Sequence, residues 1–297
     1  EVGRRMGFAE RAGAVAVEGQ LLGQLHELLQ ADRRGRRLDP ALREDLLDRV
    51  FRHTRATGTQ EEKYRSLYLR LTWTDDYLKE VLDRRVNHLV RRRYEKRKEV
   101  KALALLPNRH NKTDAVSYML SRTMSTPRDV ILFFNECIAQ SDGKPQITQD
   151  AIARAENEFS LKRLRALADE WSADYDDLFD VTIAIFKEMP GKFAWSEIDW
   201  DSIESRFIQY IINGKNEGKF FYEVVEVKYG DESDYEAAAK EIFGILHRVG
   251  ILGVRPGVSQ PIFWAHQHKL LQQTRINDDA RFYIHPAYYS VLGTTNI

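Results

Sequence analysis

Apolar residues recur at every third or fourth position over most of the chain, which is the period of helices that bury one face. The pattern is densest from Pro127 onward, where the apolar positions are Val130, Ile131, Leu132, Phe133, Phe134 and Cys137. Pro127 lacks a backbone N–H and has a fixed φ, so a helix is predicted to begin there. Because its apolar stripe covers nearly the whole circumference, we expect this helix to be buried on most sides.

The same period predicts helices along the rest of the chain. The predicted ranges are 14–30, 40–51, 73–90, 115–123, 147–159, 161–171, 175–189, 200–212 and 234–249. Residues 63–72 instead alternate polar and apolar side chains, which favours a strand, and residues 105–113 are typical of a loop.

The last third ends in short β-prone runs at 251–254, 261–265 and 281–284, separated by turn residues. Three helices followed by a small antiparallel ribbon is the layout of a winged helix-turn-helix. We therefore expect a mainly α protein with an N-terminal helical segment at 1–62, a helical bundle at 63–172 and a winged helix at 173–297.

Composition narrows the classes of function. Lysine plus arginine equals aspartate plus glutamate at 45 each, so net charge gives no reason to expect nucleic acid or an anionic membrane. The single cysteine, Cys137, fits a reducing compartment. No apolar run reaches the length of roughly 18 residues that a membrane span needs. We expect a soluble, cytoplasmic protein without a membrane partner. Since Met6 is the first methionine, the chain is also expected to be a piece of a longer polypeptide.

One local patch departs from this balance. Residues 91–98 form the most basic run in the chain. They can be a solvated helix end, where cations are favoured by the helix dipole, or a surface that contacts phosphates. The interleaved Glu95 and Glu99 favour the solvated helix end.

Motifs for catalysis or metal binding are lacking. Residues 214–220 fall one residue short of a phosphate-binding loop and end in phenylalanine, which indicates an ordinary glycine turn. The histidines His266, His268 and His285 lack zinc-site spacing and are interpreted as wing and loop residues. Glu156 and Glu158 show no acid/base pairing, and Cys137 is expected to be a core residue.

Several segments together resemble a known family. The residues concerned are Ser125 to Asn135, Ile147-Thr148 with Ile152, Ala155-Glu156 with Phe159-Ser160 and Arg163-Leu164, Glu170-Trp171, His285-Pro286, and Leu71, Trp73, Tyr77-Leu78 and Arg84-Arg85. In order and spacing they resemble the C-terminal half of prokaryotic P-loop ATPases of the STAND and AAA-like kind, which are associated with stress or phage defence.

That resemblance implies a role for the bundle as a lid over a nucleotide domain. Arg128 would contact the nucleotide phosphates as a sensor, and Asp129 would orient it or cap the helix. ATP and Mg²⁺ would be bound mainly by a nucleotide-binding domain whose Walker motifs this sequence lacks, so the chain is not expected to hydrolyse ATP by itself. The resemblance also implies a homo-oligomer and an effector protein as partner.

Three alternatives stay open at this point. Arg128 can instead be a structural ion-pair partner of Asp129 or another carboxylate. The chain can be a DNA-binding winged-helix module like those of replication initiators, although acidic residues in 234–249 and the neutral charge disfavour nucleic acid. An enzyme with an unrecognised site is the third, and no nucleophile and base can be paired to support it.

Overall fold

The computed structural model describes residues 72–94, 99–228, 234–267 and 279–294. The chain divides into two compact units, Glu1–Thr72 and Trp73–Ile297, and the fold described below is that of the second. The predicted helices at 14–30 and 40–51, and nearly all of the predicted strand at 63–72, lie outside the described residues.

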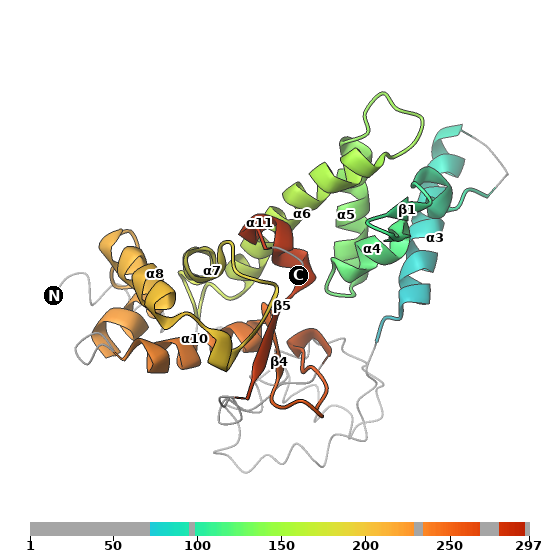
Figure 1. The fold of residues 1–297 in the computed structure, drawn as a ribbon. Helices are drawn as coiled ribbons and strands as arrows, with labels where there is room; N and C mark the ends of the chain where they lie inside the picture. Colours follow the sequence, from blue (N-terminus) through green and yellow to red (C-terminus); the bar gives the residue numbers. More distant parts are fainter. Residues whose placement is uncertain (1–71, 95–98, 229–233, 268–278, 295–297) are drawn as a thin grey trace, which may run out of the picture. The chain divides into compact units, whose positions relative to one another are not determined.

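Helices make up most of the described fold (Figure 1). The first half contains α3 (Asp75–Tyr94), the 3-10 helix η5 (Ala102–Leu105), α4 (Ala115–Ser121), α5 (Pro127–Ala139) and α6 (Gln149–Glu170). The second half contains α7 (Leu178–Phe186), η6 (Trp195–Glu197), α8 (Trp200–Ile212), α9 (Phe220–Tyr222), the π-helical turn η7 (Glu223–Lys228), α10 (Tyr235–Val249), η8 (Ala265–Gln267), η10 (Pro286–Tyr288) and α11 (Tyr289–Leu292).

The central helix, α5, begins at Pro127 as the sequence predicts. The Thr126 hydroxyl accepts a hydrogen bond from the Asp129 N–H at 3.2 Å, which caps the first turn. Behind the cap, Phe133 is fully buried and stacks on Phe159 of α6 with ring centroids 4.8 Å apart. This packing fixes the direction of α5 and therefore the place of the residues in its first turn.

One continuous helix, α6, replaces the two helices predicted at 147–159 and 161–171. That prediction was wrong because no glycine or proline interrupts the stretch, so the backbone continues through Ser160. Ser160 is fully buried, and its hydroxyl accepts the Val291 N–H at 3.1 Å. A polar residue in mid-helix therefore marks a contact with the C-terminal segment and not a helix end.

A short hairpin occupies part of the predicted loop at 105–113. Strands β1 (Arg109–His110) and β2 (Thr113–Asp114) pair antiparallel around Asn111 and Lys112, which have φ values of 47° and 68°. Two consecutive residues with positive φ are the geometry that matches strand twist in a two-residue hairpin. Two-residue strands carry too little alternation to be recognised from the sequence.

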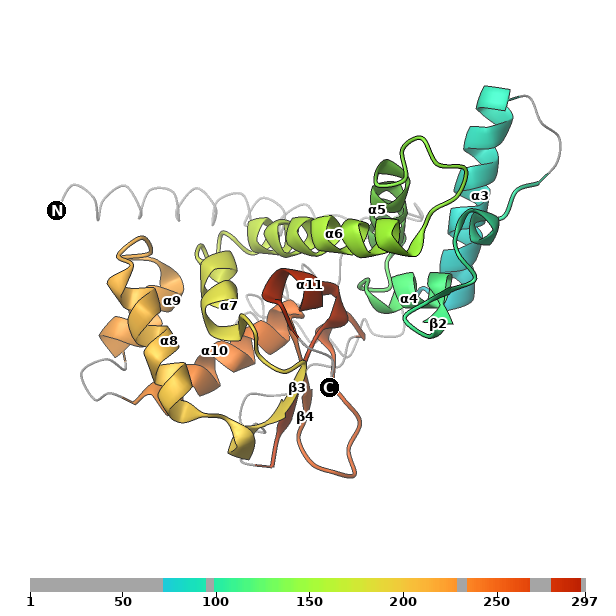
Figure 2. The same cartoon turned by 45° about the horizontal axis from the view of Figure 1, so that its top comes forward.

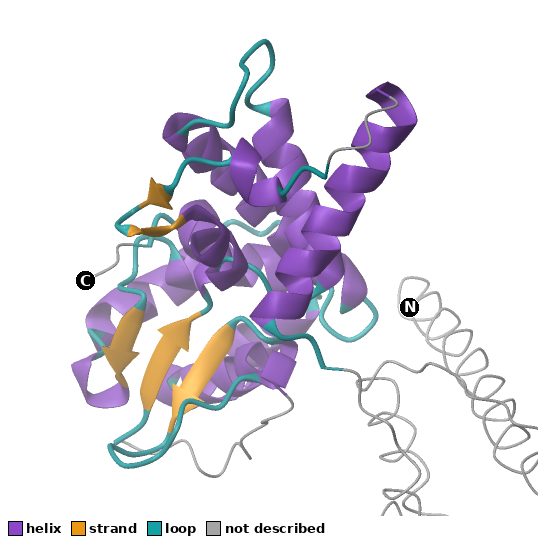
Figure 3. Cartoon of the chain, turned by 90° about the vertical axis from the view of Figure 1, so that its right-hand side faces the viewer, coloured by secondary structure: helices purple, strands orange, loops and turns teal. Residues whose placement is uncertain are grey.

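A three-stranded antiparallel sheet has the order β3-β5-β4, with strands β3 (Lys192–Ala194), β4 (Leu252–Arg255) and β5 (Arg281–Ile284) (Figure 3). Strand β5 was predicted with its observed bounds, whereas β3 was missed. The predicted strand at 261–265 is not formed. Only Phe263 pairs there, in an isolated bridge with Val254.

The end of the chain returns from the sheet to the first half of the fold (Figure 2). After β5, η10 and α11 pack on α6. A single cluster of buried apolar residues extends from Leu78 to Leu292.

The division of the chain at residues 62 and 172 stays a prediction. The described fold is mainly helical with small antiparallel sheets, as expected, and none of the described helices has the length and apolarity to cross a membrane.

The close approach of Trp264 to strand β4 leads to a stability prediction. A Cβ added at Gly253 would lie 2.7 Å from the Trp264 indole, so Gly253→Ala must displace that ring. We expect it to lower the free energy of unfolding by about 1 to 3 kcal/mol, as overpacking does. Gly257→Ala is the control, because a Cβ there meets nothing within 4 Å. Equal melting temperatures for the two variants would contradict the prediction.

Candidate functional site

Arg128 lies in the first turn of α5, and its side chain is exposed. Among the described residues no side chain forms an ion pair or hydrogen bond with it. The loop before it is constrained, since Ser125 adopts a φ of 52° and Thr126 caps the helix. The guanidinium is thus held at the entrance of a rigid helix with its donors turned to solvent, and it is not a buried ion-pair partner.

The neighbouring carboxylate has a different partner from the expected one. Asp129 is buried, and one of its oxygens lies 3.3 Å from Nε of Arg163 on α6. The same carboxylate oxygen accepts the Met124 N–H at 3.1 Å. Asp129 therefore links the α4–α5 loop to α6. Whether Arg128 senses a phosphate, and whether Asp129 helps to place it, stay predictions.

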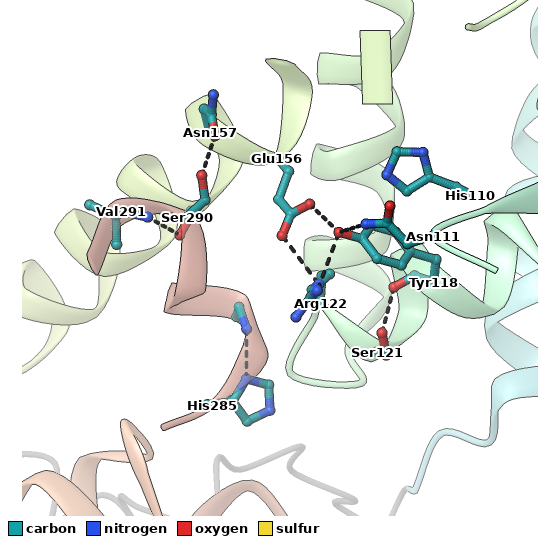
Figure 4. A network of polar contacts seen from close by, with 12 residues as sticks. His110, Asn111, Tyr118, Ser121, Arg122, Glu156, Asn157, His285, Ser290 and Val291 are labelled. Atoms are coloured by element: carbon teal, nitrogen blue, oxygen red, sulfur yellow. Dashed lines mark hydrogen bonds and ion pairs between the residues drawn. The ribbon is translucent and has the colours of Figure 1, made fainter. Parts of the chain in front are cut away.

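A second buried ion pair joins the end of α4 to α6 (Figure 4). Nε of Arg122, at the end of α4, lies 3.1 Å from Oε1 of Glu156 on α6. The Tyr118 hydroxyl donates to the other oxygen of Glu156 and accepts from Arg122 at 3.2 Å. The Arg122 guanidinium also lies over the Tyr118 ring, 4.8 Å from its centroid. These contacts offset the cost of burying two charges, although Arg122 Nε forms no hydrogen bond in the described part of the chain.

The β1–β2 hairpin closes this network on one side. The Asn111 amide donates to the Tyr118 hydroxyl at 3.2 Å. The rings of His110 and Tyr118 meet edge to face with their centroids 4.5 Å apart. Burial is the main cause that lowers the pKa of His110, and it also raises the pKa of Tyr118. At neutral pH the histidine and the phenol are therefore uncharged beside the Arg122–Glu156 pair.

These helices are similar to a known domain. Residues 76–168 match the family model described as the FunZ-associated C-terminal helical domain. No curated protein and no solved structure matches the chain.

The FunZ-like segment extends from α3 through most of α6. It therefore contains Arg128 and both buried ion pairs, and it agrees with the expectation of a C-terminal helical region. The pairs Arg122–Glu156 and Asp129–Arg163 are the buried ion pairs that link α4 and α5 to α6 in this segment.

Outside the FunZ-like segment, His285 is buried beside these ion pairs. Its Nδ1 accepts the Ala287 N–H at 3.1 Å, which fixes the neutral tautomer and caps η10. Burial, with the positive charges of His266, Arg163 and Arg122, holds the pKa of His285 well below its ordinary value. His285 therefore acts as a neutral cap where the C-terminal segment approaches the arginines.

The C-terminal segment is attached to α6 and to the end of α4 at three places. Val291 donates to Ser160, Ser290 donates to Asn157, and the Tyr289 ring lies under the Arg122 guanidinium at 5.0 Å. These contacts join parts of the chain that are distant in sequence. A change in the position of α6 would therefore be transmitted to the segment that follows the sheet.

The remaining candidates are located as follows. Cys137 is fully buried, and burial raises the pKa of its thiol to about 12, which confirms a core residue without a reactive thiolate. The rings of His266 and His285 meet edge to face at 4.8 Å, while His268 lies outside the described residues. In the described part of the chain, no three histidine, cysteine or acidic side chains are grouped as metal ligands are.

Sequence reasoning did not single out Tyr118, Arg122 or His110, and it set Glu156 aside. The available signal was the helical spacing of four between Tyr118 and Arg122, which places both on one face of α4. Their partner, Glu156, lies on α6, which is separated from α4 by the whole of α5, and only packing of the helices brings it close.

Proposed function

We propose that this chain is the regulatory part of a P-loop ATPase, in which the helical segment 63–172 serves as a lid and Arg128 contacts the phosphates of bound ATP. One observation carries the proposal: Arg128 is an exposed arginine with no partner among the described residues, in the first turn of a helix whose other face is buried. A planar guanidinium with its donors free suits a phosphate. ATP and Mg²⁺ would be held mainly by a nucleotide domain, which would supply the Walker motifs.

The role of Asp129 in this proposal is indirect. Its carboxylate links the α4–α5 loop to Arg163, so it positions the first turn of α5 and with it Arg128. A change of nucleotide state felt at Arg128 would move α5 relative to the nucleotide domain. Because α5 packs along α6, the movement would reach the C-terminal segment through Ser160 and Arg122.

We further propose that residues 173–297 form a winged helix. The order α7, β3, α8, α10, β4, β5 and the sheet order β3-β5-β4 support this, since a winged helix places its first strand between its first two helices. The paired residues Val254 and Phe263 would form the base of the wing. If the chain is the regulatory part of an ATPase, this winged helix would bind an effector protein or the ATPase core.

A DNA-binding winged helix is the second candidate, favoured by the same order of elements. In that case α10 would be the recognition helix. Its exposed side chains are Glu236, Lys240 and Arg248, and Glu236 accepts from the Trp195 indole at 3.3 Å. A recognition helix contacts base edges with its N-terminal residues, and the acidic N-cap Asp234 and Glu236 at this end of α10 support the regulatory role over DNA binding.

ATP hydrolysis by the full-length protein encoded by the gene tests the proposal. Arg128→Ala is expected to lower the turnover number at least tenfold, which corresponds to about 1.4 kcal/mol of transition-state stabilisation. Arg128→Lys should recover only part of the lost turnover, because the lysine ammonium is a point charge and lacks the planar donors of the guanidinium. The melting temperature should not change, since the side chain is exposed.

Lys144→Ala is the matched control, because Lys144 is also an exposed cation close to one end of α5. Its turnover number should equal that of the wild type. Unchanged turnover in Arg128→Ala, or the lack of ATPase activity in the full-length protein, would reject the phosphate-sensor role.

A further inference from the structure

The solvent face of α3 carries two large exposed aromatic side chains at its start. Trp73 precedes the helix with 45% of its surface exposed, and Tyr77 lies one turn later with 58% exposed. Neither ring contacts another aromatic ring in the part of the chain that the structure describes. Two exposed rings within about one helical turn of each other offer flat apolar faces on which a planar group can stack.

The other end of α3 is strongly basic. Residues 84–93 contain arginine at 84, 85, 91, 92 and 93 and no acidic residue, and all five side chains are exposed. Arg85, Arg92 and Arg93 have no ion-pair partner among the described residues. Arg84 and Arg91 pair with Glu80 and Glu99, but exposed pairs of this kind contribute little and yield readily to a phosphate.

The acidic residues near this helix are mostly engaged. Asp83 accepts the Ala102 N–H at 2.7 Å. Asp75 and Asp76 lie in the first turn, where the helix dipole favours them. The basic half of α3 therefore has an uncompensated positive charge, although the whole chain is neutral.

Tyr77 and most of the basic residues share one side of the helix. At 100° per residue, Tyr77, Arg84, His88 and Arg91 fall within about 60° of one another, Arg85 and Arg92 flank them, and Arg93 falls on the opposite side. The opposite side, with Leu78, Leu82 and Val86, is buried. Figures 1 and 2 place α3 at the edge of the described helices, beyond α4 and α5, so no described helix covers this face.

We propose that the solvent face of α3 binds single-stranded nucleic acid, independently of the function proposed above. Tyr77 and Trp73 would stack on unpaired bases, and Arg84, Arg85, Arg91 and Arg92 would contact the phosphates of the same strand. Positive charge alone would fit any polyanion. The two exposed rings favour a single strand, because stacked duplexes do not offer base faces to side chains.

The test is fluorescence anisotropy with the full chain and a labelled 20-nucleotide single strand, compared with a duplex of the same sequence. Wild-type protein should bind the single strand more tightly. Tyr77→Ala should weaken single-strand binding by roughly 5- to 150-fold, the range measured for one stacked base. The double variant Arg85→Gln/Arg92→Gln should reduce the slope of log affinity against log salt by about 1.4, for two lost phosphate contacts.

Control variants separate this face from general charge and from the winged helix. Lys144→Gln/Lys187→Gln removes two exposed cations elsewhere, and Lys240→Gln changes the exposed face of α10. Both control variants should leave the affinity within about twofold of the wild type. Because the altered side chains of α3 are exposed, melting temperatures should be unchanged.

Three outcomes would overturn the proposal. The first is no binding of the single strand at 50 mM salt. The second is binding that neither α3 variant weakens. The third is tighter binding of the duplex with no effect of Tyr77→Ala, which would indicate a purely electrostatic surface or the winged helix instead.

Discussion

Glu156→Ala is expected to lower the free energy of unfolding by about 3 to 5 kcal/mol. Arg122 and Glu156 are both nearly inaccessible to solvent, with 9% and 12% of their side-chain surfaces exposed. Removal of the carboxylate leaves the Arg122 guanidinium charged, buried and without its counter-charge, and it also removes the acceptor for the Tyr118 hydroxyl. Urea denaturation followed by circular dichroism measures the loss.

Glu158→Ala is the matched control, because Glu158 lies on the same helix two residues away and is exposed. It should change stability by no more than about 0.5 kcal/mol. Replacement of Arg122 and Glu156 together by methionine should recover part of the loss, since no charge is then left unpaired. A loss in Glu156→Ala no larger than in Glu158→Ala would show that the pair does not stabilise the fold.

Asp177→Ala is expected to destabilise the second half of the fold by about 3 kcal/mol. Asp177 is 1% exposed and accepts hydrogen bonds from the backbone N–H groups of Phe221 and Tyr222 and from the Tyr210 hydroxyl. Truncation would leave three donors without their acceptor, two of them buried and the Tyr222 N–H half-buried, at a cost of about 1 kcal/mol or more for each. Thermal melting compares the variant with Asp176→Ala.

Asp176 is a suitable control because it caps the same turn, at the Phe220 N–H, but is exposed, so water can replace it. Its substitution should cost no more than about 1 kcal/mol. Similar losses in the two variants would contradict the importance that we assign to burial at Asp177.

The pH dependence of stability gives a second check on Asp177. Burial is the main cause that raises its pKa above the ordinary value of 3.8, in spite of the hydrogen bonds that it accepts. The unfolded chain therefore ionises this group first as the pH rises. Its contribution to stability is complete below pH 3.8 and is lost as the pH rises through the folded pKa. The stability deficit of Asp177→Asn should therefore shrink between pH 3 and pH 7, and a growing deficit would contradict this cause.

Elements with strong local signals were predicted well. Thr126-Pro127 sets the start of α5, helix α8 has its predicted bounds, and Gly250 ends α10 with a φ of 94°. Each is decided by residues within one or two turns, since a proline, an apolar stripe or a glycine acts on its own backbone. Predictions failed where the local signal was weak, as in the short strand β3.

The amino-acid sequence by itself determined that the described part of the chain is mainly helical, that a helix begins at Pro127 with Arg128 in its first turn, and that Cys137 belongs to the core. The expectation that this helix is buried on most sides was wrong, because Asn135 and Ile138 are exposed. Only the tertiary structure decided that Asp129 pairs with Arg163, that Arg122 pairs with Glu156, and that the C-terminal segment attaches to α6. The physical reason is that periodicity and caps act within one element. The partner of a buried charge, in contrast, is chosen by the packing of helices that are distant in the chain.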